Sequence, residues 1–176
     1  KRPFTIDRWD FQSDFDAKIS ETGSDFMGVN LGKTHYGIMF GDNTCMANAC
    51  GLLSEMLQSA GRDEEAGRMK NLGQSLWQRL NNLSWKGNFY RHWYPLNPER
   101  DVDFGVDTAE QVTLSNAMAL IRGLEHNKCV KIIQTYQRIR EEMPKSSPGE
   151  WYMCYPPFEK GWHINKWEYM NGGFSP

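Results

Sequence analysis

Residues 105–120 have the sequence GVDTAEQVTLSNAMAL, a polar and acidic loop that runs directly into an apolar segment. Asp107 or Thr108 can cap the free backbone N–H groups of a first helical turn, and Glu110 follows at a capping-box position. Gly123 is expected to end this helix after about four turns. The stretch therefore predicts the first helix of a helical hairpin.

The rest of the chain repeats this arrangement. A second helix is expected at 125–143, and an earlier hairpin is expected from helices at 42–60 and 63–83, with Gly61 between them. Aromatic, turn-rich segments at 85–95 and 151–158 favour short strands over helices. The buried face is expected to carry Met46, Ala49, Cys50, Leu53 and Leu57 in the first helix, and Val130, Ile133, Tyr136 and Ile139 in the last.

Acidic helix starts recur along the chain at Asp42, Asp107 and Glu168, about 65 and 61 residues apart. Periods of this size are typical of arrays of helical hairpins. The sequence thus predicts a mainly α fold of tandem antiparallel hairpins at 42–176, with short β segments in the loops and an irregular segment at 1–41. If the first helix of each pair lies inside the array, the acidic starts meet at one end.

The composition excludes several classes of partner. A net charge of −2 argues against nucleic acid, which normally requires a basic face. No apolar stretch approaches the ~20 residues of a membrane-spanning helix, so no membrane partner is expected. The four cysteines lack the spacing of a zinc site, and neither a metal nor another cofactor is expected. No signal peptide is recognisable, which leaves the compartment open, with a secreted or periplasmic location preferred.

Aromatic side chains are abundant, with 7 Trp, 7 Tyr and 9 Phe beside a negative mean hydropathy. Rings in polar loops can form a binding face for flat, hydroxylated ligands, although core filling is an equal alternative. Lys1 is not an initiator Met, and the last residues have the pattern of the opening of a further element. We therefore expect the chain to be a fragment of a larger protein.

Three motifs resemble the six-hairpin glycosidase superfamily, whose catalytic domains are (α/α)6 barrels. They are GDN at 41–43, DTAEQ at 107–111 and WEYMNGG at 167–173, of which the last is the most specific. The resemblance covers about 36–176 and implies part of such a toroid, with two full hairpins and the start of a third. It also implies a glycoside hydrolase with a carbohydrate substrate, in which two carboxyl groups about 6.5–9.5 Å apart face each other across a cleft.

The resemblance makes four carboxylates catalytic candidates, Asp42, Asp107, Glu110 and Glu168. Asp107 and Glu110 lie only three residues apart, so we expect one to cap the helix and the other to face the substrate. Both could equally be capping groups without a chemical role. The positive end of the helix dipole stabilises an ionised carboxylate, which makes a capping carboxylate a better base than acid.

The candidates for substrate binding are polar and aromatic side chains of the loops. They are Arg91, His92, Trp93, Tyr94, Trp151, Trp162, His163, Trp167 and Asn171. Rings could stack on sugars, histidines could bind hydroxyl groups, and Arg91 could bind a charged sugar. The alternatives are core packing, ordinary loop histidines and a local ion pair.

Two other functions fit the same pattern. A sugar epimerase or polysaccharide lyase on an α/α toroid would use His92, His163 or a tyrosine as base, with Arg91 holding an acid group. A non-catalytic helical binding module would need none of these residues. In every case, an incomplete array leaves apolar faces uncovered, and self-association is expected.

Overall fold

A computed structural model describes residues 5–6, 36–96, 98, 106–143 and 154–156 of the chain. Six of the candidate residues lie outside these ranges, namely Trp151, Trp162, His163, Trp167, Glu168 and Asn171. The expected third hairpin start and most of the irregular segment at 1–41 also lie outside them. The expectations for these residues therefore stay predictions.

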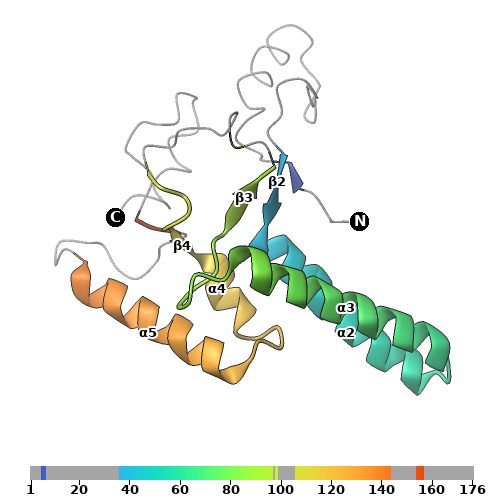
Figure 1. Ribbon diagram of the computed structural model, residues 1–176. Coiled ribbons are helices and arrows are strands. Elements are labelled where there is room, and N and C mark those ends of the chain that lie inside the picture. The colour runs from blue at the N-terminus through green and yellow to red at the C-terminus, as the bar shows by residue number, and fades with distance from the viewer. Residues whose placement is uncertain (1–4, 7–35, 97, 99–105, 144–153, 157–176) are drawn as a thin grey trace, which may run out of the picture.

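The described part of the chain is mainly helical, as expected, with short strands between the helices (Figure 1). The elements are β1 (Thr5–Ile6), β2 (Tyr36–Met39), α2 (Phe40–Ser59), α3 (Asp63–Ser84), β3 (Trp93–Pro95), β4 (Val112–Thr113), α4 (Leu114–Ala119), α5 (His126–Glu142) and β5 (Cys154–Tyr155). One antiparallel sheet has the order β1-β2-β3, and β4 pairs antiparallel with β5. No helix among the described residues has the length and apolar character needed to cross a membrane.

Helices α2 and α3 form a long antiparallel hairpin, with the three-stranded sheet at the end where α2 begins (Figure 1). Gly61 ends α2 as expected, because its φ of 73° favours glycine. The helices approach closely at Gly73, where an added Cβ would lie 2.9 Å from the Ala47 carbonyl oxygen. The Ser54 hydroxyl donates to the Ala66 carbonyl across the same interface at 2.8 Å. Small side chains therefore hold the two helices together.

The expected buried face of α2 is wrong. The buried residues of this helix are Phe40, Asn43, Thr44, Ala47, Cys50 and Ser54. Only Cys50 of the five expected residues is among them, whereas Met46 and Leu53 are 50% and 43% exposed. Because α3 packs against the small side chains of α2, the Met and Leu side chains of α2 face outward. Whether another copy of the chain covers them stays a prediction.

The main core lies where the sheet meets the helices. Phe40 stacks on Tyr90 with ring centroids 4.2 Å apart and an interplanar angle of 12°. Ile38, Leu80 and Ile132 complete this buried cluster together with Ala119. The segment at 85–95 forms the expected short β structure, because Trp85 pairs with Tyr90 and β3 follows.

The expected helix from about residue 107 to Gly123 is wrong at both ends. The helix α4 spans only Leu114–Ala119, 6 residues, and Gly123, with a φ of 76°, lies in the turn that follows it. Val112 and Thr113 lie in β4 instead, where they pair with Tyr155 and Cys154. Pairing with a distant strand therefore replaces the first turns of the expected helix.

The last helix, α5, has nearly the expected bounds, and its buried face was expected only in part. Its buried residues are Ile132, Thr135 and Ile139, of which Ile139 was expected. Val130 and Ile133, which were expected inside, are 37% and 45% exposed. The hydroxyl of Thr135 donates to the Lys131 and Asn88 carbonyls, which allows a polar residue to face inward.

Candidate functional site

The beginnings of α2 and α4 meet at one end of the helices. A methyl group on Gly41 would lie 3.1 Å from Cβ of Ser115, so the two chain segments are in contact there. Arg122 stabilises this corner, where α2 and α4 begin. Its Nη1 donates to the Gly41 carbonyl and to the Thr44 hydroxyl, each at 2.9 Å. The first turns of both helices therefore share one corner of the fold.

His92 lies at this corner. Its backbone carbonyl accepts a hydrogen bond from the Phe40 N–H at 2.7 Å, and its Nδ1 lies 3.1 Å from the Ser115 hydroxyl oxygen. Ser115 Oγ lies 2.6 Å from Thr113 Oγ1. The Ser115 hydroxyl, which is itself hydrogen-bonded to Thr113, therefore orients the imidazole.

Asp42 provides the carboxylate next to this histidine. It is exposed in the first turn of α2, where the helix dipole favours a negative charge. Burial lowers the pKa of His92, and the negative charge of Asp42 acts in the opposite direction. The imidazole is therefore favoured in its neutral form, with a carboxylate close enough to influence its charge.

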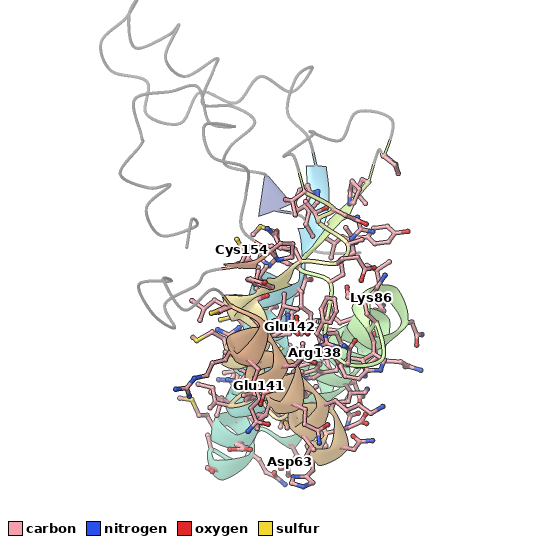
Figure 2. The ribbon with its side chains drawn as sticks, turned by 90° about the vertical axis from the view of Figure 1, so that its left-hand side faces the viewer. Asp63, Lys86, Arg138, Glu141, Glu142 and Cys154 are labelled. Carbon is pink, nitrogen blue, oxygen red and sulfur yellow. The ribbon has the colours of Figure 1, made fainter. Side chains whose placement is uncertain are left out.

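Asp107 and Glu110 do not cap a helix, contrary to expectation. Asp107 Oδ1 accepts from the Ala109 N–H at 2.8 Å, and the Glu110 N–H donates to the Asp107 carbonyl at 3.0 Å, which makes a turn. The N-cap of α4 is Thr113, without a side-chain capping bond. The Glu110 carboxylate forms an exposed ion pair with Lys86, which is labelled in Figure 2, at 2.7 Å.

The aromatic candidates of the described part differ in exposure. Trp93 is only 6% exposed, and its ring lies so close to Gly37 that an added Cβ there would lie 2.3 Å away. Trp93 therefore packs in the interior. Tyr94 is partly exposed, and the Arg91 guanidinium carbon lies 5.3 Å from the centre of its ring. A role in stacking on sugars stays a prediction for Tyr94.

Asn116 is a residue of this region that the sequence did not single out. Its side chain is fully buried, its Oδ1 accepts from the Tyr90 N–H at 2.7 Å, and its Nδ2 donates to the Tyr90 carbonyl at 2.9 Å. The segment that carries Arg91 and His92 is thus held by one amide group. A polar residue at an apolar helix position is the signal that could have revealed it, because buried amides need partners.

Ser115, Thr113 and Arg122 were also missed, and no local pattern distinguishes them from ordinary helix-end residues. Within the described ranges, no group of three or more His, Cys, Asp or Glu side chains could hold a metal ion. A cavity of about 490 Å³ lies nearby between β2, α2 and α3, lined by Ile38, Asn43, Leu76, Arg79, Leu80, Asn82 and Leu83.

Comparisons with known proteins do not add to this picture. No family model matches the chain, and searches among curated proteins and solved structures give no match.

Proposed function

We propose that the protein acts on carbohydrates as a glycoside hydrolase built on tandem helical hairpins of the (α/α)6 type, with its site at the corner where α2 and α4 begin. The observation that carries the proposal is that Asp42 begins α2 at the same corner as His92, where the negative charge of Asp42 acts to raise the pKa of the imidazole. The motif at 167–173 supports it by its resemblance to six-hairpin glycosidases.

The chemistry assigns different roles to the carboxylates. Asp42 is exposed at the start of α2, a position that suits a base that activates water. Glu168, in the motif that resembles the glycosidases, is then the acid that protonates the leaving oxygen. Glu110 is a weaker candidate, because its ion pair with Lys86 already uses its charge.

Conservative substitutions in the full chain test this assignment. Asp42→Asn and Glu168→Gln should each lower the turnover of aryl glycosides or oligosaccharides by about 100-fold or more, because each removes an acid or base group. Both variants should still bind the sugar. Glu55→Gln, at an exposed carboxylate of α2, is the matched control and should keep its activity. Full activity of the Asp42 and Glu168 variants would show that these carboxylates do not catalyse hydrolysis.

A second candidate is a sugar epimerase or polysaccharide lyase with His92 as the base. The observation that favours it is the buried imidazole, whose lowered pKa and contact with Ser115 suit proton abstraction. A lyase forms an unsaturated sugar that absorbs in the ultraviolet, whereas a hydrolase does not. Loss of this product in His92→Gln, with retention in Asp42→Asn, would favour the lyase over the hydrolase.

A further inference from the structure

The backbone around Arg91 is held in place from several sides. The Asn116 side chain bonds to both backbone groups of Tyr90, the Arg91 N–H donates to the Ser84 carbonyl at 2.8 Å, and the His92 carbonyl accepts from the Phe40 N–H. Functional side chains are most effective when they extend from a fixed backbone. Arg91 therefore extends from a fixed point beside His92.

Among the described residues, the guanidinium group of Arg91 has an aromatic neighbour but no carboxylate partner. Its Nε is buried and has no hydrogen-bond partner. No ion pair involves Arg91 in the ranges that the structure describes, whereas Lys86 pairs with Glu110, and Arg122 donates to Gly41 and Thr44. A buried donor without an acceptor is costly, so this arginine is either a structural defect or a group that awaits a ligand.

The neighbouring tyrosine indicates what Arg91 could bind. The guanidinium carbon lies 5.3 Å from the centre of the Tyr94 ring, an arrangement that orients the planar group while leaving its N–H edge for an acceptor. The N–H groups of arginine match the two oxygens of a carboxylate.

We infer that Arg91, stacked on Tyr94, binds the carboxylate of a uronic acid unit in the substrate. The inference rests on the proposed function, because it specifies the class of sugar that the same site accepts. A uronic acid combines a planar carboxylate for the guanidinium with a sugar ring whose C–H face suits an aromatic side chain. Arg91 and His92 are adjacent in sequence, so the bound carboxylate lies close to the proposed catalytic corner.

Binding of D-glucuronate and D-glucose to the full chain, measured by calorimetry, tests the inference. The unmodified protein should prefer glucuronate. Arg91→Met should weaken glucuronate binding by about 10- to 100-fold, as expected for the loss of hydrogen bonds to a charged group, and leave glucose binding unchanged. Arg91→Lys keeps the positive charge but lacks the paired N–H groups of the guanidinium, so it should retain only part of the affinity for glucuronate. Arg138→Met, on the exposed surface of α5 (Figure 2), is the matched control and should bind as the unmodified protein does.

Thermal unfolding of the same variants separates binding from a structural role. If Arg91 serves a ligand, Arg91→Met should melt at the same or a higher temperature than the unmodified protein, because it removes a buried donor without a partner. Glucuronate binding that is unchanged in Arg91→Met, or a lower melting temperature with unchanged binding, would overturn the inference. Equal competition by inorganic phosphate would also overturn it, because the site would then not be selective for a sugar carboxylate.

The inference and the proposed function can fail separately. Suppose that the unmodified protein does not prefer glucuronate and that Arg91→Met hydrolyses neutral glycosides at an unchanged rate. The inference about Arg91 would then be overturned, while the proposed hydrolase activity would stand. Binding of glucuronate that depends on Arg91, in a protein that cleaves no glycoside, would support the carboxylate site and refute the hydrolase.

Discussion

Gly73 is the position at which a single added methyl group tests the packing of α2 against α3. A Cβ on this residue would lie 2.9 Å from the Ala47 carbonyl oxygen and 3.2 Å from Cβ of Cys50. Non-bonded carbon atoms normally lie about 3.5–4.0 Å apart. Because the closer neighbour belongs to the backbone, the helices have to separate, and overpacking of this kind costs about 1–3 kcal/mol.

The same substitution also has a favourable effect, because alanine is a better helix former than glycine by about 1 kcal/mol. Gly67 provides the control, since it lies on the same helix and an added Cβ there would meet nothing within 4 Å. Gly67→Ala should therefore stabilise the protein by up to about 1 kcal/mol. The gain in helix propensity is common to both variants, so Gly73→Ala should be less stable than Gly67→Ala by the overpacking cost alone, about 1–3 kcal/mol.

Urea unfolding followed by far-ultraviolet circular dichroism measures this difference. The free energy of unfolding is obtained from the midpoint and the slope of each transition, and a shared slope would show that the unfolded states are comparable. If Gly73→Ala is as stable as Gly67→Ala, then α2 and α3 do not pack through small residues at this point. The explanation for the outward-facing Leu and Met side chains of α2 would then also be wrong.

Four further outcomes follow from other features of the chain. Asn116→Ala should lower the free energy of unfolding by about 2–5 kcal/mol, because it leaves both buried backbone groups of Tyr90 without partners, whereas Asn71→Ala on the exposed side of α3 should change it by less than about 0.5 kcal/mol. Because the pKa of His92 is lowered in the folded protein, its contribution to stability is fully present above the unfolded pKa of about 6.5 and is lost as the pH falls below that value. Unfolding measured at several pH values should show this loss of stability. The loss should be smaller in His92→Gln. Asp42→Asn should lower the pKa of His92 further, which an NMR titration of the imidazole would detect, and an unchanged pKa would contradict the proximity of the two groups. Sedimentation velocity should reveal self-association at rising concentration, because large apolar side chains are exposed on α2 and α5, and a monomer at all concentrations would contradict this expectation.

The helices could be predicted from the sequence wherever a local signal ended them. Gly61 adopts a positive φ directly after the C-cap of α2, because glycine has no Cβ to clash in this conformation, whereas Gly123 has a positive φ but lies in a turn beyond the end of α4. The starts of α2 and α3 also lie within two residues of the expected positions. These signals act within a few residues, so they are visible without knowledge of the tertiary structure.

The buried faces could not be predicted in the same way. In α2, the pattern of large apolar residues pointed to Met46 and Leu53, but the partner helix approaches the side that carries Ala47 and Ser54. Hydrophobic periodicity assumes that the largest apolar side chains face the core. It fails here because α2 and α3 approach closely at Gly73, and only small residues fit between them.

The candidate site could be predicted only in part. The sequence singled out Asp42, Arg91 and His92, and the structure brings Asp42 and His92 close enough for their charges to interact. It did not single out Ser115 or Asn116, whose partners are 23 and 26 residues away in the chain. Such contacts depend on the folded arrangement, and serine and asparagine at helix ends have ordinary local explanations.

The start of α4 shows why the local pattern at 107–110 misleads. Asp107 accepts a hydrogen bond from the N–H two residues later. An aspartate makes this contact both in an isolated turn and at a helix start, so its presence in the sequence does not distinguish these two structures. The pairing of Val112 and Thr113 with β5 then decides between them, because an extended strand cannot be the first turn of a helix. The shift carries Glu110 away from the helix start and into an ion pair with Lys86. The residue that meets the beginning of α2 is Ser115 instead, and its contact is His92 rather than a second carboxylate. A hydrolase with its base at Asp42 therefore needs its acid from another segment, and activity that survives Glu168→Gln would leave His92 as the group to test next.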